Sequence, residues 1–97
     1  MNIGALKIKL QLFDNHSLKA KRKIVQSLIT KLRNEFPISV AEVDLQDSKS
    51  YAVIGIALIS SDKTLIRSLL DKVMAFVLDN QGNYQVIDDE KYIHSEL

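Results

Sequence analysis

Four cationic side chains follow Ser17 within the next six residues: Lys19, Lys21, Arg22 and Lys23. The hydroxyl of Ser17 can cap a helix, because it can accept a hydrogen bond from a free backbone N–H of the first turn. A helix that begins there directs these N–H groups, and about half a unit of positive charge, toward the same place as the side chains. Together these groups can bind phosphate, so the chemistry that this segment predicts is anion binding.

The cations are unfavourable in this place unless something offsets their repulsion. Lys19 repels Arg22 and Lys23 at helical spacings, and the positive helix end opposes it as well, at a combined cost of about 0.5 to 2 kcal/mol. An anionic partner would offset that cost. The alternative is that the lysines only solvate the helix while their methylene stems shield the core, a role that Lys21 could fill at the edge of the apolar arc. The sequence leaves both interpretations open.

A helix between residues 17 and 36 must position these cations. Apolar residues recur in it at helical spacing, and polar residues form a neighbouring stripe that faces solvent. The arc is Leu18, Ile24, Val25, Leu28, Ile29, Leu32 and Phe36, and the stripe is Lys19, Arg22, Gln26, Thr30 and Arg33. Arg33, along this stripe, is predicted to contact phosphates together with Ser17 and the four cations that follow it. Pro37 cannot continue the helix, so we expect it to end at Glu35 or Phe36. Six basic residues and one acid give this segment a net charge of +5, against +1 for the whole chain.

Three further segments before residue 60 predict strands. Residues 3–12 alternate between apolar and polar side chains, as in a half-buried strand, and residues 51–59 form the almost continuous apolar run of a central strand. Residues 38–45 lie between them and are less regular. We expect Ala41, Val43 and Leu45 to face inward there and Glu42 and Asp44 to face outward, in a hairpin with the apolar strand.

The remainder of the chain completes a known arrangement. Asp62 can cap a second amphipathic helix, Asn80-Gln81-Gly82 ends it, and residues 84–92 form a shorter, more polar strand. The order βαββαβ predicts an α+β protein with a ferredoxin-like fold, in which a four-stranded antiparallel sheet carries two helices on one face. The strand order usual for that fold is 4-1-3-2. A chain of 97 residues supports one core, so we expect residues 1–97 to form a single domain.

Composition excludes several classes of protein. Hydrophobic residues make up 46% of the chain and charged residues 26%, which is typical of a folded globular domain. The absence of cysteine excludes disulfides, a thiolate nucleophile and a cysteine-based zinc site, and it fits a reducing compartment. The N-terminal residues lack the pattern of a signal peptide, and no apolar run approaches the length of a membrane span. We therefore expect a soluble, cytoplasmic protein without a membrane partner.

An acid, an imidazole and a hydroxyl lie within four residues, at Asp14, His16 and Ser17. A hydrolytic triad needs these groups on separate supports, which so short a connector does not provide, and Ser17 already has a role as a cap. We predict no catalytic residue and expect a protein that is not an enzyme. An enzyme acting on a small phosphorylated substrate remains a third hypothesis, and it requires a concave pocket beside His16, Ser17 and Arg22.

Neither a metal nor a cofactor is predicted. His16 and His94 are the only imidazoles and belong to no metal-binding motif, and Asp88-Asp89-Glu90 is predicted to be a solvated turn. Three glycines are too few to form a phosphate-binding loop or a dinucleotide fingerprint.

One side of the apolar strand is expected to lie on an open sheet face. It displays Tyr51, Val53, Gly55, Ala57 and Ile59, with one aromatic ring, so it lacks the stacking residues of RNA-recognition sheets. An uncovered apolar sheet in so small a protein favours a homodimer that forms through a sheet face or edge, with Tyr51, Val53 and Ile59 in the interface. The alternative function is therefore a homodimeric protein-interaction or regulatory module with no direct nucleic-acid contact.

Two segments together carry a family resemblance. They are Ser17-Leu18-Lys19-Ala20-Lys21-Arg22 and Ser39-Val40-Ala41-Glu42-Val43-Asp44, the latter followed by Gln46-Asp47. Over essentially its whole length the chain resembles the YlxP-like family of small bacterial proteins, a domain of unknown function. The resemblance implies a ferredoxin-like fold, no established enzymatic activity, and genes that often lie among those for translation initiation and ribosome maturation factors. It therefore favours contact with ribosomal RNA or a ribosome assembly intermediate. The chain departs from the family at Ala20, where Glu is usual, and at Lys49 or Ser50, where an aromatic is often seen.

Overall fold

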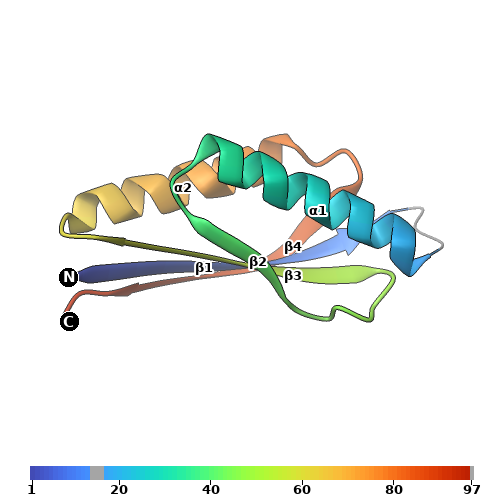
Figure 1. Cartoon of the computed structure of the whole chain (residues 1–97), viewed down its shortest axis with the longest axis horizontal. Coiled ribbons are helices and arrows are strands. Elements are labelled where there is room, and N and C mark those ends of the chain that lie inside the picture. Colours follow the sequence, from blue (N-terminus) through green and yellow to red (C-terminus); the bar gives the residue numbers. More distant parts are fainter. Residues whose placement is uncertain (14–16, 97) are drawn as a thin grey trace.

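Six regular elements follow one another in the order that the hydrophobic pattern predicts. The structure, a computed structural model, describes residues 1–13 and 17–96. The elements are β1 (Asn2–Leu12), α1 (Leu18–Glu35), β2 (Ser39–Asp44), β3 (Tyr51–Ser60), α2 (Lys63–Asp79) and β4 (Tyr84–His94). Figure 1 shows both helices above the sheet, α2 toward the end of the molecule where both chain ends lie and α1 toward the other end.

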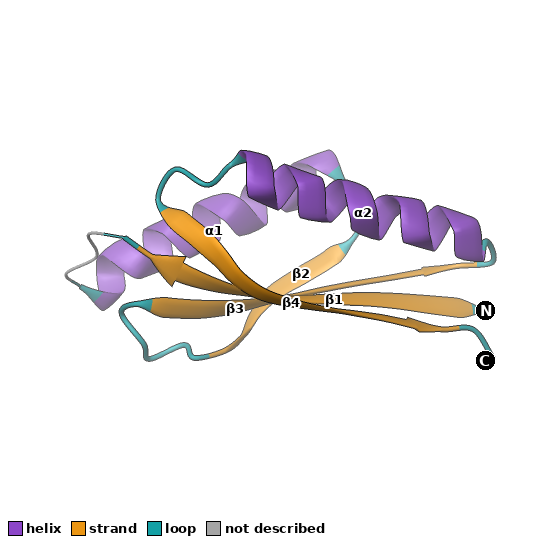
Figure 2. Cartoon of the chain, turned by 180° about the vertical axis from the view of Figure 1, so that it is seen from behind, coloured by secondary structure: helices purple, strands orange, loops and turns teal. Residues whose placement is uncertain are grey.

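The four strands form one antiparallel sheet in the order β2-β3-β1-β4. The predicted ferredoxin-like fold and strand order are thus confirmed, with β1 and β3 in the middle. Both helices pack on the same face of the sheet, as the front and rear views show (Figures 1 and 2). No helix of the described residues lies on the other face, which we call the open face.

Each helix begins at a residue whose side chain satisfies free backbone donors. The Ser17 hydroxyl accepts a hydrogen bond from the Ala20 N–H at 3.0 Å, which confirms the predicted cap. The Asp62 carboxylate accepts from the Thr64 and Leu65 N–H groups at 2.9 and 3.2 Å. α1 ends at Glu35, and Pro37 follows its C-cap, as expected for a residue that cannot extend a helix.

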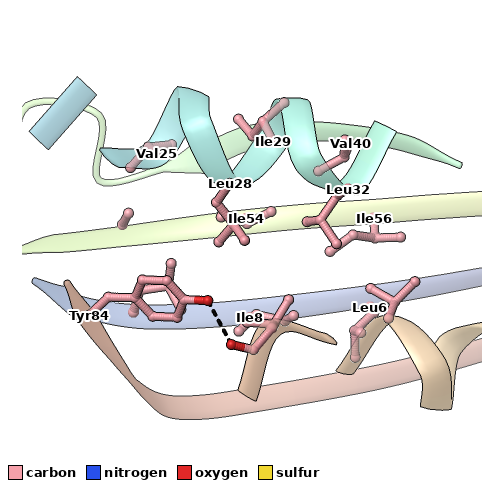
Figure 3. Close-up of a cluster of buried hydrophobic side chains, with 14 of the residues drawn as sticks. Leu6, Ile8, Val25, Leu28, Ile29, Leu32, Val40, Ile54, Ile56 and Tyr84 are labelled. Carbon is pink, nitrogen blue, oxygen red and sulfur yellow. Dashed lines mark hydrogen bonds between the residues drawn. The ribbon is translucent and has the colours of Figure 1, made fainter. Parts of the chain in front are cut away.

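The core lies between the helices and the sheet. β1 contributes every second side chain to it, as its alternation predicts, and the helices contribute residues at helical spacing. Figure 3 shows Val25, Leu28, Ile29 and Leu32 of α1 facing Ile54 and Ile56 of β3, with Leu6 and Ile8 of β1 below. Tyr84 closes the cluster on the side of β4. Its hydroxyl donates to the Val77 carbonyl of α2 at 2.6 Å, and burial raises the pKa of Tyr84 to about 12.

The facing of residues 40–43 of β2 is opposite to the prediction, whereas Asp44, beyond the register shift, is exposed as predicted. Val40 is buried and pairs with Ile56, which places Glu42 on the helix side of the sheet, whereas Ala41 and Val43 are exposed on the open face. A register shift between Glu42 and Asp44 ends the regular pairing, and Leu45 follows in the left-handed region with φ of 57°. The long-range pairing of Val40 thus decides which side of this strand faces the core.

The acidic run near the C-terminus is also placed differently from its prediction. Residues 88–90 lie within β4 and stand opposite Lys9, Ile8 and Lys7 of β1, so they form part of the sheet and not a turn. β4 extends to His94, two residues beyond its predicted end.

Candidate functional site

Three of the predicted anion-binding residues project from the start of α1 into solvent. Lys19, Arg22 and Lys23 are all exposed, and among the residues that the structure describes no carboxylate forms an ion pair with them. Arg33 is exposed three turns further along the helix. We call these four side chains the basic surface.

The rest of the solvent-facing side of α1 is free of negative charge until its last residue. The exposed residues between the cations are neutral and polar, namely Gln26, Ser27, Thr30 and Asn34. Lys31 adds a further exposed cation on the flank, and Glu35 is the only acid in the helix. The exposed charges of α1 are therefore five positive and one negative, a sum of +4.

Lys21 does not belong to the basic surface, which corrects its predicted role in anion binding. Its side chain is fully buried, and its ammonium lies 3.0 Å from the Glu42 carboxylate. The same ammonium donates to the backbone carbonyl of Leu45 at 2.6 Å and lies 3.4 Å from that of Gln46. A ligand in solvent cannot reach a charge that is held in this way.

The contacts of Lys21 explain why it is tolerated inside the protein. It shares the inward side of α1 with Val25 and Leu28, so its methylene stem packs in the core while its ammonium reaches the far end of β2. A buried ammonium is costly unless a carboxylate and further acceptors surround it, and Glu42 and two carbonyls supply these. Lys21 therefore ties the first turns of α1 to the β2–β3 connection.

Glu42 is the residue that sequence reasoning missed. It was predicted to face solvent, but its side chain is only 13% exposed beside Lys21. The signal was available in two places: Lys21 falls on the inward arc of the helix with Val25, and Glu42 alternates with Val40. Each pattern puts one charge in the core, and a buried charge requires an opposite one.

The start of α1 keeps its positive electrostatic character. The helix has no acidic residue in its first turn, and its cap is the neutral hydroxyl of Ser17, which is exposed. The helix dipole and the neighbouring cations therefore add to a positive potential in solvent. Asp14 and His16 of the candidate triad lie outside the described residues.

Arg33 combines a structural contact with exposure. Its guanidinium donates to the Val40 carbonyl of β2 at 2.9 Å. A guanidinium has five N–H donors, so this bond leaves others for a ligand. Arg33 follows Arg22 by eleven residues, which at 1.5 Å per residue is about 16 Å along the helix.

The predicted interface residues of β3 are not equally accessible. Ile59 is 67% exposed and Tyr51 37% exposed on the open face, with the Lys9 ammonium 5.3 Å from the centre of the Tyr51 ring. Val53 is only 4% exposed, so it cannot be a major contact residue as predicted. It lies between Lys9 on one side and Asp44 on the other, beside the register shift of β2.

Two concavities lie on the open face. A polar one of about 210 Å³ is lined by Lys7, Lys9, Asp44, Leu45, Val53, Asp88, Asp89 and Glu90. An apolar one of about 440 Å³ is lined by Ala5, Leu6, Lys7, Ser39, Val40, Ala41, Val43, Gly55, Ile56, Ala57 and Tyr92. Neither borders Ser17 or Arg22, where the hypothesis of a phosphorylated small-molecule substrate requires a pocket.

Metal-ligating side chains do not gather in the described part of the chain. No group of three or more histidines and carboxylates within residues 1–13 and 17–96 is placed to hold a metal ion. In the same residues, neither helix has the length and apolar character that crossing a bilayer requires.

Solved structures share the fold at low sequence identity. The protein YJCS aligns with a TM-score of 0.59 and 12% identity, over 93% of this chain and 96% of its own. The de novo designed protein Foldit4 aligns with a TM-score of 0.55 and 12% identity, over 99% and 98% of the two chains. SnoaB, a cofactor-independent oxygenase from Streptomyces nogalater, gives 0.52 and 6% identity over 98% and 92%. These likenesses concern the fold alone.

Sequence comparison places the chain in a family. An uncharacterized protein of Bacillus subtilis (strain 168), YlxP, is 32% identical over 75 residues, which are 77% of this chain and 82% of that protein. Residues 3–91 match the family described as "Protein of unknown function (DUF503)". The predicted YlxP-like resemblance is confirmed, and the chain belongs to the DUF503 family of proteins of unknown function.

Proposed function

We propose that this protein is a non-enzymatic RNA-binding protein that contacts phosphates through the basic surface of α1, with ribosomal RNA or a ribosome assembly intermediate as its partner. The observation that supports this function best is the separation of charge on α1. The one cation that packs inward has a carboxylate of its own, whereas Lys19, Arg22, Lys23 and Arg33 remain in solvent without one among the described residues.

The charge of α1 stands out against that of the whole chain. Its exposed residues sum to +4, while the chain as a whole carries +1. A local positive field of this kind raises the encounter rate with a polyanion without making the whole surface adhesive. The positive end of the helix, which has no acidic residue in its first turn, adds to this field beside Lys19.

Contact with the phosphate backbone fits this surface better than readout of bases. Lysine and arginine on a helix face neutralise phosphates and fix orientation, and they carry little sequence information. The open face of the sheet is a poor alternative, because Asp88 and Glu90 stand on it opposite Lys9 and Lys7 and would repel a phosphate chain. RNA is therefore expected to approach from the helix side.

The decisive experiment measures binding to purified ribosomal subunits by sedimentation over a series of salt concentrations. The test variant replaces Lys19, Arg22 and Lys23 with Gln, and the matched control replaces Lys63, Arg67 and Lys72 of α2 with Gln. Both triples remove two lysines and one arginine from exposed helix positions. Each lost phosphate contact lowers the slope of log K against log salt by about 0.7 to 0.9, so the α1 triple should flatten it by about 2 to 3.

The control separates a binding surface from net charge. The α2 triple should keep most of the native affinity and slope. Equal losses in both triples, an unchanged α1 triple, or a native chain that does not sediment with subunits at low salt would each reject the proposal.

A second candidate function has its own support in the structure. The apolar concavity of about 440 Å³ on the open face favours a homodimeric protein-interaction module without direct nucleic-acid contact. Under that hypothesis, a charge placed in the concavity abolishes complex formation, while the α1 triple changes nothing.

A further inference from the structure

The apolar half of the open face has the shape of a shallow hollow. Four small residues on three neighbouring strands form its floor: Ala5, Ala41, Gly55 and Ala57. Ala5 stands opposite Ala57, and Ala41 stands opposite Gly55, so the small residues are contiguous across the sheet. No helix covers this face of the sheet in the described part of the chain (Figure 2).

Large apolar side chains surround the hollow on the same face. Tyr92 stands next to Ala5 and is 53% exposed, Ile59 is 67% exposed, and Val43 is 49% exposed beside Gly55. Val43 leans so closely over Gly55 that a Cβ there would lie 2.8 Å from its Cγ1. Projections and a hollow on one surface allow two copies to interlock about a two-fold axis, because each copy presents both.

The two edges of the sheet are poorly suited to pairing with another chain. The β2 edge has six residues, a register shift and the left-handed Leu45 after it, all of which interrupt a ladder. On the β4 edge, an antiparallel second copy would bring residues 88–90, three consecutive acids, close to their counterparts. Charge and backbone geometry therefore favour the face over the edges.

The face is large enough for a stable dimer. Four strands about 4.8 Å apart, with 11, 6, 10 and 11 residues at about 3.3 Å each, cover about 600 Å² in projection. Specific interfaces bury about 600 to 1,000 Å² on each partner, so the face reaches the lower end of that range. The apolar hollow lies toward one end, and the opposed charges of Lys7 with Glu90 and Lys9 with Asp88 lie beside it, so the face combines an apolar part with a polar part, as protein interfaces do.

We infer that a second copy of this chain covers the open face, so that Tyr92 and Ile59 of each copy pack into the hollow of the other. The helices lie on the opposite face of the sheet, so the two basic surfaces point away from each other in this dimer (Figure 1). The inference depends only on the open face, and it stands or falls independently of RNA binding by α1.

Sedimentation equilibrium of the full chain tests the dimer. The native protein should sediment at twice the 11.0 kDa mass of one chain. Ala57→Glu places a charge in the hollow and should give a monomer, whereas the matched control Ala75→Glu, at an exposed position of α2, should remain a dimer. Circular dichroism and thermal unfolding show whether each variant is folded. If Ala57→Glu fails to fold, Tyr92→Ala replaces it and should weaken the dimer at least tenfold.

Three outcomes would overturn the inference. A native chain that is monomeric at its highest soluble concentration excludes the second copy. A folded Ala57→Glu or Tyr92→Ala variant that dimerises as tightly as the native chain shows that the interface lies elsewhere. A monomer that enhances anilinonaphthalene sulfonate fluorescence, with the enhancement lost in Ala57→Glu, assigns the hollow to a small apolar ligand instead.

Discussion

The two helices perform the same task in the fold but present different surfaces to solvent. α1 has 18 residues and α2 has 17, and both pack on the same face of the sheet (Figure 1). α1 exposes cations separated by neutral polar residues. α2 exposes Lys63, Arg67 and Lys72 together with Asp71, Asp79 and the half-exposed Leu65 and Leu78. One of its acids, Asp71, pairs with Lys91 of β4 at 2.6 Å.

Packing against a sheet constrains only the inward side of a helix. The mixed charges of α2 are typical of a surface with no particular electrostatic task, and they show that the fold does not require the one-signed surface of α1. The N-caps also leave α1 the more positive of the two helices. The negative Asp62 carboxylate offsets the positive end of the α2 dipole, whereas the neutral Ser17 hydroxyl does not offset that of α1. This difference is why we propose the outward side of α1, and not that of α2, as the binding surface.

The inward sides differ as well. The buried residues of α2 are all aliphatic, namely Ile66, Leu70, Val73 and Val77, whereas α1 places Lys21 among its aliphatic residues. Each helix also has a buried polar contact with the sheet. In α1 it is the ion pair of Lys21 with Glu42, and in α2 it is the hydrogen bond that the Tyr84 hydroxyl donates to the Val77 carbonyl.

Among the changes that test this difference between the helices, removal of the carboxylate that pairs with Lys21 should reduce stability the most. Glu42→Ala leaves the buried ammonium without its counter-charge, so we expect the free energy of unfolding to fall by about 3 kcal/mol. Urea denaturation of the native and variant chains measures it. Glu35→Ala, which removes an exposed acid of α1, is the control and should change stability by less than about 0.5 kcal/mol. A cost for Glu42→Ala no greater than that of the control would show that the pair contributes nothing.

Replacement of both members of the ion pair tests whether the lost stability comes from the unpaired charge. Lys21→Met with Glu42→Leu makes the inward side of α1 aliphatic, like that of α2, and should recover most of the stability lost in Glu42→Ala.

The buried polar contact of α2 should fail at alkaline pH. The Tyr84 phenol has the ordinary tyrosine pKa of 10.0 in the unfolded chain and a pKa of about 12 in the folded protein, because burial disfavours the phenolate. Between these two values the unfolded chain releases the proton and the folded chain keeps it, so stability is present in full below pH 10 and falls as pH rises toward 12. Unfolding measured across this range should show a shallower decline in Tyr84→Phe, and identical slopes in the two proteins would contradict the assignment.

The smallest expected difference in stability is between variants that lack one or the other helix cap. Ser17→Ala and Asp62→Ala each remove one cap and should cost about 1 kcal/mol, with Asp62→Ala the more damaging by a few tenths because it also removes a charge that favours the helix dipole. Thermal unfolding at low and high salt distinguishes the two, since only the charge contribution of Asp62 is screened. A Ser17→Ala variant that is more salt-sensitive than Asp62→Ala would reverse the expected contrast between the helices.

Local pattern was sufficient for most of the fold. β1 alternates without exception, and the start and end of α1 are marked by Ser17 and Pro37, so these elements were predictable from neighbouring residues alone. β2 was not, because apolar residues occupy both of its sides. Val40 and Glu42 face the helices only through pairing with β3 and the contact with Lys21, which lies 21 residues earlier than Glu42 in the chain.

The candidate site was predictable to the same extent. Exposure of Lys19, Arg22 and Lys23 follows from the helical period, but the burial of Lys21 depends on a partner in another element. Val53 was misplaced for a similar reason. Alternation along β3 predicts that Val53 lies on the open face. Its burial there depends on the register shift where β2 ends, and no local signal in the sequence marks that shift.

The buried pair between Lys21 and Glu42 also constrains how this sequence can diverge. Replacement of one partner alone leaves the other as an unpaired charge inside the molecule. Replacement of both by aliphatic residues of similar volume leaves no charge there. Substitutions at these two positions are therefore expected to arise together in the evolutionary history of the family, as a covarying couple, whereas no buried partner ties Lys19, Arg22 or Lys23 to a second position in this way.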